Sequence, residues 1–541
     1  MNKMKFTVLS DIHYISRRRI LPGSPEDVFM HPAATETALR MASEVEDTDI
    51  ILITGDLTDD GDIWSHEDLI AILKDLQNKG KRVFVTTATH DFHHHRAYTR
   101  CYNDTKVQYK SEPWHTPYFD PATADYRKLV KDEYAWLDDK SITPQLVRCA
   151  TPAELWDLYA DFGRNQAFSV CDEAYSYCVE LDEQTWCIML NDNFRNIEAR
   201  HNESVTYPAS CLRWIRELVV QAEAEGKFVF ACTHHPLVPP VPAYRIGADN
   251  RNMRESQVGH LLADLGIQLV FSGHTHFADV GFMESDSGNL LCDITTPSVW
   301  HYPPQFNVVT LDGQNHTVAF DSVELKTVDG FDLGEKTFKA YIRENFEADY
   351  RNKFKNIPSP LNKIILAAQV KHLYPLFKLN CKLTKEEYKQ IEHRYLFDII
   401  MDLVHNMLGG DGSYTPDTPM YKFMMSACAS LDSIINTQPF KNIKKDLLKG
   451  YSVSEVIEPM LFNNFIPDNN ASAFDFTKKP TARVQPPVYK SHAGEILMVL
   501  LCILILPLAK LMPFAAVAAL PAMTIRKKMQ QKKHTVLPER Y

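Results

Sequence analysis

Five short apolar runs in the first half of this 541-residue chain impose the strongest limit on its fold. The runs are residues 5–10, 49–54, 82–87, 227–232 and 267–272. Their length and their β-branched and aromatic content are typical of buried strands. Residues 66–79, between the second and third runs, have apolar side chains at helical spacing and end at Gly80, which predicts an amphipathic helix. Strands that alternate with helices predict a layered α/β fold.

Further strands are predicted in the same half of the chain. They are residues 175–181, 185–190, 290–295 and 306–311. Residues 92–165 are instead rich in aromatic and polar side chains and have weak periodicity, so we interpret them as an insertion. Such an insertion would either help to shape a substrate pocket or decorate the surface.

Acidic and histidine side chains directly follow all five apolar runs. They are Asp11 and His13, then Asp56, then His90 and Asp91, then His234 and His235, and finally His274 and His276. Imidazole and carboxylate groups together suit Zn, Mn and Fe. Because strand ends in layered α/β folds meet at one edge of the sheet, we expect these side chains to gather there.

Each cluster has an alternative explanation when it is taken alone. A D-x-H triplet is often chance, residues 55–61 also form a turn signature, and a single histidine is commonly hydrogen-bonded within the fold. Five coincidences at five strand ends would be needed to explain the whole set in this way. We therefore favour a metal site.

In this order, the motifs D-I-H, G-D-L-T-D-D-G, T-H-D, H-H-P and G-H-T-H resemble the calcineurin-like metallophosphoesterase family. The resemblance covers roughly residues 5–325 and includes S-H-E-D-L and Y-P-P-Q-F-N-V-V-T-L. It implies a layered α-β-β-α sandwich over residues 1–325. It also implies hydrolysis of a phosphate mono- or diester at two divalent or trivalent metal ions, either Mn, Fe or Zn.

The resemblance also implies the ligands of each ion. They are Asp11, His13 and His276 for the first ion, His234 and His274 for the second, and Asp56 as the bridge. His90 is expected to remain uncoordinated and to stabilise or protonate the leaving oxygen, and Asp91 to orient it. His235 is next to a ligand and is interpreted as a structural residue, or as one that supports a ligand without binding metal itself.

One position departs from the family pattern. Thr89 stands where the family carries the Asn of G-N-H-D or G-N-H-E, whose amide completes the second metal shell. A hydroxyl is a shorter and weaker neutral ligand than an amide oxygen. The second ion would then bind loosely, or recruit a water or another side chain. The histidine run at 93–95 is a candidate substitute, and a solvated loop is the alternative interpretation.

The resemblance leads to two functional hypotheses. In the first, two ions activate a water for in-line attack on phosphorus, and His90 assists departure of the alcohol. The second is a membrane-attached binding or scaffold protein on a weakened phosphoesterase fold, with one metal and little activity. Thr89 motivates the second hypothesis. Monoesters, diesters, cyclic nucleotides and lipid head groups are all possible substrate classes.

The pattern changes to that of a helical domain over residues 326–465. Helices are predicted at 336–353, 384–408, 420–436 and 443–448. Thr384 and Glu387 form a capping box, and Gly409 with Gly410 ends that helix. No chemical motif is present there. Residues 466–492 contain four prolines among polar residues and are interpreted as a linker.

Residues 493–523 are almost wholly apolar and precede a basic tail at 524–541. This length suits a membrane anchor, although Pro507 and Lys510 lie near its middle. A tilted single span and a re-entrant hairpin are both possible. The basic tail and the absence of a signal sequence favour the hairpin or an interfacial anchor. A buried pair of helices is the alternative.

Composition excludes several other classes of function. The net charge of −11 argues against nucleic-acid binding through a basic surface. The eleven cysteines form no C-x-x-C pair and are expected to be free or buried thiols in a reducing compartment. Together with the apolar C-terminal segment, this leads us to expect a membrane-associated protein. Its C-terminal segment would bind membrane lipid, and its catalytic domain would be cytoplasmic.

Overall fold

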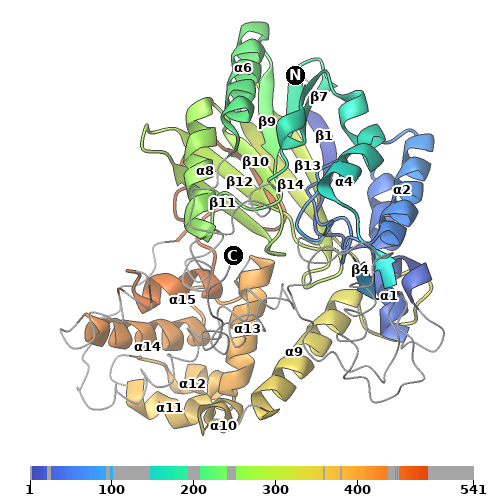
Figure 1. Cartoon of the computed structure of the whole chain (residues 1–541). Coiled ribbons are helices and arrows are strands. Elements are labelled where there is room, and N and C mark those ends of the chain that lie inside the picture. The colour runs from blue at the N-terminus through green and yellow to red at the C-terminus, as the bar shows by residue number, and fades with distance from the viewer. Residues whose placement is uncertain are drawn as a thin grey trace, which may run out of the picture.

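A computed structural model describes most of the chain. The described residues are 3–20, 26–92, 98–100, 146–192, 207–239, 251–356, 360–377, 381–410, 412–436, 445, 448 and 450–484. Within them the chain forms two large β-sheets and, beside these, a group of helices (Figure 1).

The first sheet has six strands in the order β15-β14-β13-β1-β2-β3. Their bounds are β1 (Met4–Leu9), β2 (Ile50–Ile53), β3 (Arg82–Val85), β13 (Gln305–Asp312), β14 (Thr317–Glu324) and β15 (Ala471–Asp475). β1, β2 and β3 are parallel, whereas β13 runs antiparallel to β1. The carboxyl ends of the three parallel strands therefore lie at one edge.

The second sheet has seven strands in the order β11-β12-β10-β9-β8-β7-β6. Their bounds are β6 (Ser169–Cys171), β7 (Ser176–Asp182), β8 (Thr185–Met189), β9 (Phe228–Cys232), β10 (Leu269–Ser272), β11 (Asp279–Glu284) and β12 (Leu290–Thr295). β8, β9, β10 and β12 are parallel. All five runs that predicted buried strands thus form parallel strands of the two sheets.

The two sheets pack face to face, and helices cover their outer faces (Figure 1). Phe6 on β1 stacks on Phe230 of β9 at 5.5 Å between ring centroids, within the apolar layer between the sheets. The first sheet is covered by α1 (Glu26–Ser43) and α2 (Ile63–Asn78), and the second by α6 (Ala209–Glu225) and α8 (Arg251–Leu265). The predicted α-β-β-α layering is confirmed.

The predicted insertion is only partly described. Strands β4 (Tyr98–Arg100) and β5 (Leu146–Arg148) pair antiparallel, so Arg100 and Leu146 lie side by side. Helix α4 (Pro152–Leu158) follows, with short 3-10 helices at Arg17–Arg19, Ala160–Phe162, Arg164–Gln166 and Asp172–Ala174 elsewhere in the domain. The run at 93–95 lies outside the described residues, and the effect of the insertion on a pocket stays a prediction.

The C-terminal part of the described chain forms a helical unit, which comprises α9 to α15 (Figure 1). Its helices are α9 (Phe338–Asn356), α10 (Pro360–Ala367), α11 (Val370–Phe377), α12 (Lys385–Ile391), α13 (Leu396–Gly409), α14 (Pro419–Ile435) and α15 (Val453–Leu461). The capping box of Thr384 and Glu387 and the stop after Gly409 are confirmed. Of the helix predicted at 443–448, only two residues are described.

The prediction of one continuous helix over 384–408 is wrong. The chain forms two helices, α12 and α13, separated by a turn in which Arg394 N–H donates to Ile391 O at 3.0 Å. Tyr395 pairs with Gln369 in an isolated bridge, and Leu396 N–H donates to Ala368 O at 2.9 Å. These contacts with a distant segment outweigh local helix propensity.

The helical unit packs directly against the loop after β10. Phe277 is fully buried in the same apolar cluster as the helices. The N–H of Ala278 donates to Leu408 O at 2.8 Å, and the N–H of Val280 donates to Asp468 Oδ1 at 2.8 Å. The segment that carries the predicted ligands His274 and His276 is therefore anchored directly after His276.

The predicted linker at 466–492 requires a correction. Ala471–Asp475 forms β15, which pairs antiparallel with β14 at the edge of the first sheet. Phe476, directly after it, is fully buried and lies 5.5 Å from Phe228 between ring centroids. Burial of these apolar side chains stabilises a strand whose polar and proline-rich neighbours suggested a linker. The sandwich therefore includes residues beyond 325.

Two remaining predictions concern the cysteines and the membrane segment. The nine described cysteines are all free and buried, as expected. Residues 493–541 lie outside the described part of the chain. Among the described helices, none has the length and apolarity required to cross a bilayer.

Candidate metal centre

The structure brings the strand-end residues of both sheets together. Asp11, His13, Asp56, His234, His274 and His276 are all at least nine-tenths buried and lie just beyond β1, β2, β9 and β10. Their ligand atoms form overlapping groups of three with the spacing that a metal ion requires. The convergence expected from the strand ends is therefore present.

The first group consists of Asp11, His13 and His276. His276 Nε2 lies 3.2 Å from Asp11 Oδ1 and 3.3 Å from His13 Nε2. Two imidazole nitrogens at this distance can hydrogen-bond only if one is protonated, whereas a cation between them would satisfy both. Asp11 Oδ1 is buried and accepts no well-directed hydrogen bond from the described residues. This donor set fits a metal ion.

Asp56 connects this group to the second one. Its Oδ1 accepts the backbone N–H of His90 at 2.8 Å. Its Oδ2 lies 3.2 Å from His234 Nε2 and 3.9 Å from His13 Nε2. One carboxylate oxygen thus faces ligands of both groups, which is the arrangement needed for a bridge.

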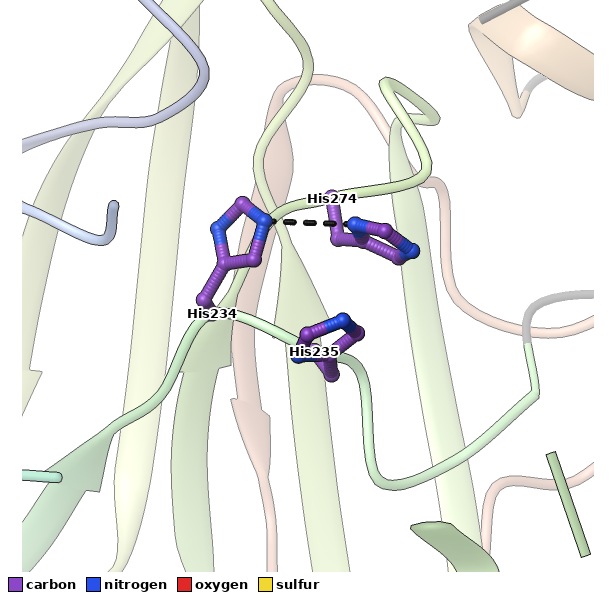
Figure 2. A group of neighbouring side chains, drawn as sticks. All are labelled: His234, His235 and His274. Carbon is purple, nitrogen blue, oxygen red and sulfur yellow. Dashed lines mark hydrogen bonds between the residues drawn. The ribbon is translucent and has the colours of Figure 1, made fainter. Parts of the chain in front are cut away.

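The second group consists of His234, His235 and His274 (Figure 2). His234 Nε2 lies 3.2 Å from His274 Nδ1. His234 Nδ1 lies 3.0 Å from the carbonyl of Thr54, which can only accept, so Nδ1 carries the hydrogen. Nε2 therefore faces His274 and Asp56, and in the neutral ring it would carry the lone pair that metal coordination requires.

The backbone at these positions is unusual. Asp11, His13, Asp56, His274 and His276 all have positive φ, between 44° and 65°. This conformation is uncommon for residues other than glycine, and surrounding contacts must stabilise it. The N–H of Asp11 donates to the carbonyl of Gly55 at 3.0 Å, and that of His13 donates to the carbonyl of Asp56 at 2.9 Å. The strand-end turns therefore support one another across the sheet.

Close packing between the sheets also requires glycine at two of these turns. At Gly273, a Cβ atom would lie 1.7 Å from Ser10 Oγ and 2.4 Å from Asp11 Oδ2. At Gly55, which has φ of 98°, a Cβ would lie 2.8 Å from His234 Nδ1. Glycine thus permits the approach of the turns that carry the ligands.

Charge in the site is concentrated and buried. Burial favours a neutral Asp56 carboxyl, but the charges of His234 and His90 outweigh it and hold the pKa of Asp56 well below its ordinary value. Burial lowers the pKa of His13, whereas its contact with Asp59, 3.4 Å from Nδ1, and the charge of Asp56 raise it to about 9 overall. The buried carboxylates are thus held ionised beside protonated imidazoles, and a metal ion that binds here would displace those protons.

His90 lies at the edge of this centre and is only partly buried. Its Nδ1 donates to the carbonyl of Asp59 at 2.7 Å, and its ring centroid lies 4.7 Å from that of His13. His90 Nε2 is therefore the nitrogen that remains for contact with a substrate.

The predicted role of Asp91 requires a correction. Its carboxylate accepts the N–H of Thr58 at 2.8 Å and the N–H of Ala88 at 2.7 Å. Burial and the charge of Asp56 raise the pKa of Asp91 to about 7. Asp91 thus supports the turn that carries His90, whereas the ring of His90 is oriented by the carbonyl of Asp59. One of these N–H groups belongs to the turn of Asp91 itself and the other to the turn after β2, so both carboxylate oxygens are occupied by backbone donors.

Thr89 also lies at the centre. Its hydroxyl is 3.5 Å from Asp56 Oδ1, at the limit of a hydrogen bond, and the same oxygen accepts from the N–H of His90. The hydroxyl therefore contacts the bridging carboxylate.

Three residues of the site were not identified from the sequence. Asp59 lies 3.4 Å from His13 Nδ1, and Asp192 lies 2.9 Å from His235 Nδ1. The ring of His301 is 4.4 Å from that of His276 between centroids. Asp192 closely follows the strand predicted at residues 185–190. The expectation that side chains after strand ends gather at one edge of the sheet therefore applied to it as well. Asp59 and His301 reach the site only through the path of the loops that carry them, which local sequence does not predict.

Comparisons with known proteins agree with this geometry. A family model described as calcineurin-like phosphoesterase matches residues 4–278. A search of curated proteins found no match.

Two solved structures are similar to parts of the chain. A dimetal phosphatase from Danio rerio has 13% sequence identity and a TM-score of 0.33, over 59% of this chain and 96% of that one. A Staphylococcus aureus protein described as a 5′-nucleotidase, solved with alpha-ketoglutarate, has 13% identity and a TM-score of 0.28, over 74% of this chain and 72% of that one. Similarity this low carries no conclusion about substrate.

Proposed function

Because the chain belongs to the calcineurin-like phosphoesterase family, we propose that it hydrolyses phosphate mono- or diesters at a centre of two metal ions. The observation that carries the proposal is the position of Asp56 Oδ2, which faces His234 and His13 from a buried carboxylate. A shared oxygen between two groups of nitrogen and oxygen donors is what a dinuclear site requires.

Each ion has its own set of residues in this proposal. Asp11, His13 and His276 hold the first, His234 and His274 hold the second, and Asp56 bridges them. Mn, Fe and Zn all accept a mixed set of imidazoles and carboxylates. When bound, such a pair of ions lowers the pKa of a coordinated water and polarises the phosphoryl oxygens.

His90 supplies the remaining chemistry. With Nδ1 donating to the carbonyl of Asp59, Nε2 is positioned to stabilise or protonate the leaving oxygen. Asp91 maintains the turn on which His90 stands through its bonds to Thr58 and Ala88. The leaving oxygen would thus be stabilised or protonated by a side chain that is not itself a metal ligand.

The experiment that tests this function measures hydrolysis and metal content together. Purified protein, stripped of metal and reloaded with Mn²⁺, is assayed with p-nitrophenyl phosphate and with bis-p-nitrophenyl phosphate. We expect turnover of at least one of them, in proportion to bound Mn²⁺. Two bound equivalents without turnover of any ester in a wider phosphoester panel would contradict the proposal.

Thr89 supports a second candidate function, that of a membrane-attached binding or scaffold protein with one metal and little activity. Its hydroxyl contacts Asp56, and this leaves the second group with one fewer family ligand. The metal stoichiometry separates the two functions, because the scaffold function requires one bound equivalent and the hydrolase requires two. Attachment through residues 493–523 is likewise our proposal, and it rests on their apolar sequence.

A further inference from the structure

The two proposed ion sites have unequal numbers of protein donors. The first has three residues of its own together with the shared Asp56, which makes four. The second, as proposed above, has only His234 and His274 with Asp56, which makes three. A tetrahedral site has four ligands, so the second site has room for another donor.

Thr89 is a poor candidate for that fourth position. Its hydroxyl is neutral and short, and lies within reach of Asp56 Oδ1 at 3.5 Å. A threonine hydroxyl that donates to the bridging carboxylate positions that carboxylate, and its remaining lone pairs bind a divalent ion only weakly compared with an imidazole nitrogen.

His235 is placed far better. Its ring centroid lies 4.1 Å from that of His274 and 5.0 Å from that of His234. Each of the three rings offers a nitrogen within 4.8 Å of the other two. Figure 2 shows the three side chains grouped around one space at the end of β9 and the loop after β10.

Asp192 lies beside one of the two ring nitrogens of His235, in an ion-pair contact rather than a well-directed hydrogen bond. Its Oδ2 lies 2.9 Å from His235 Nδ1 and accepts the backbone N–H of the same residue at 2.9 Å. It also accepts from Thr233 Oγ1 at 3.0 Å. With the carboxylate beside Nδ1, Nε2 remains for coordination. Histidine ligands of metals are commonly held by a carboxylate at the other ring nitrogen.

The loop that carries His235 is anchored on its far side as well. Asp293 on β12 accepts the N–H of Leu237 at 2.6 Å and the N–H of Val238 at 3.1 Å. The side chain of His235 is itself only 9% exposed. The position of His235 is therefore determined before any metal binds, which lowers the entropic cost of coordination.

We propose that His235 is a ligand of the second metal ion and provides, through Nε2, the donor that Thr89 does not supply. This inference rests on the proposed dinuclear centre. It revises the interpretation of His235 from the sequence, in which this residue is structural or supports a ligand without binding metal. The second ion would then be held by three imidazoles and the bridging carboxylate, a set that favours Zn²⁺ over Mn²⁺.

Metal titration of the full chain tests the inference without reference to turnover. Calorimetric titration with Zn²⁺ is compared between the wild type and His235→Ala, with His393→Ala as the control for loss of a histidine, because His393 is 70% exposed. We expect one of two Zn²⁺ equivalents to bind at least ~10-fold more weakly in His235→Ala, and no change in the control. If both Zn²⁺ equivalents bind to His235→Ala with the same affinities as to the wild type, the proposal is overturned.

A rescue variant and a crystal structure provide two further tests of the same proposal. Thr89→Asn, added to His235→Ala, supplies an amide oxygen and should restore most of the lost Zn²⁺ affinity. If His235→Ala does not fold, a crystal structure of the Zn²⁺-loaded wild type decides the question. We expect His235 Nε2 at about 2.0–2.1 Å from one ion. A distance beyond coordination would refute the assignment.

The two proposals fail in different ways. If His235 coordinates Zn²⁺ but no phosphoester is hydrolysed, then only the proposed function is wrong. If esters are hydrolysed and two ions bind with unchanged affinity in His235→Ala, then only the role of His235 is wrong.

Discussion

Asp56 and His234, from turns at the ends of strands in different sheets, meet at 3.2 Å between Oδ2 and Nε2. The same oxygen is 3.9 Å from His13 Nε2, and Oδ1 is occupied by the N–H of His90. The two sheets thus share one carboxylate, and the proposed chemistry depends on this contact.

Replacement of Asp56 by Asn should lower metal content. The amide keeps the shape of the side chain but loses the negative charge that a bridge between two cations requires. We expect at least one of two Mn²⁺ equivalents to be lost after dialysis, measured by elemental analysis. Circular dichroism of the metal-free variant provides the control for folding. Unchanged stoichiometry would remove the bridging role from Asp56.

Replacement of His90 by Ala should separate catalysis from metal binding. His90 is not needed as a ligand in the proposed centre, and its ring is held by the carbonyl of Asp59. We expect kcat to fall by ~10²–10⁴-fold with metal content nearly unchanged. Near-normal turnover would exclude His90 as the group that assists the leaving oxygen.

Replacement of Gly273 by Ala should damage the centre through packing. The added Cβ would lie 1.7 Å from Ser10 Oγ and 2.4 Å from Asp11 Oδ2, so the turn or the carboxylate must shift. Overpacking of this kind costs ~1–3 kcal/mol in free energy of unfolding.

The matched control for Gly273→Ala is Gly409→Ala, whose nearest atom would be Tyr302 Cε1 at 4.0 Å. We expect a lower melting temperature and weaker Mn²⁺ binding for Gly273→Ala only. Equal behaviour of the two variants would show that the close approach of Gly273 to Asp11 has no energetic importance.

His405 should make the helical unit sensitive to acid. Burial and the charge of Arg343 lower the pKa of His405 to about 3, against the charge of Asp402, which raises it. Neither ring nitrogen has a hydrogen-bond partner among the described residues, and Glu347 Oε1 lies 3.6 Å from Nδ1. Its ring lies 4.7 Å from that of Tyr302 between centroids. Because the pKa in the unfolded chain is about 6.5, the unfolded state takes up a proton that the folded state does not.

Stability is therefore lost as the pH falls from about 6.5 toward the folded pKa, by about 2 kcal/mol at pH 5. We expect His405→Leu to reduce this loss. The measurement compares variant and wild type by the difference in their free energy of unfolding between about pH 7.5 and about pH 5. If both proteins lose the same stability, His405 does not titrate as proposed.

Removal of residues after 484 should test membrane attachment. The segment 493–523 has the apolar length of an anchor, and the basic tail at 524–541 suits anionic head groups. We expect the full chain to float with liposomes in a density gradient and the shortened chain to stay at the bottom. Flotation of neither protein would argue for a buried pair of helices instead.

Much of the fold was predictable because the signals are local. The apolar content of residues 5–10 and 49–54 predicts two strands. The structure forms β1 at Met4–Leu9 and β2 at Ile50–Ile53. The break at residues 392–395 and the strand Ala471–Asp475 were missed, because both depend on pairing with segments far away in sequence.

The amino-acid sequence by itself determined which residues stand at the strand ends, because strand periodicity and the position of Asp11, Asp56 and His234 after apolar runs are properties of neighbouring residues. Only the tertiary structure decided which of them face each other. Asp91 supports a turn, Asp192 approaches His235, and His301 stacks beside His276. These contacts join separate strand ends and loops, and their distances follow from how the two sheets and the helical unit pack.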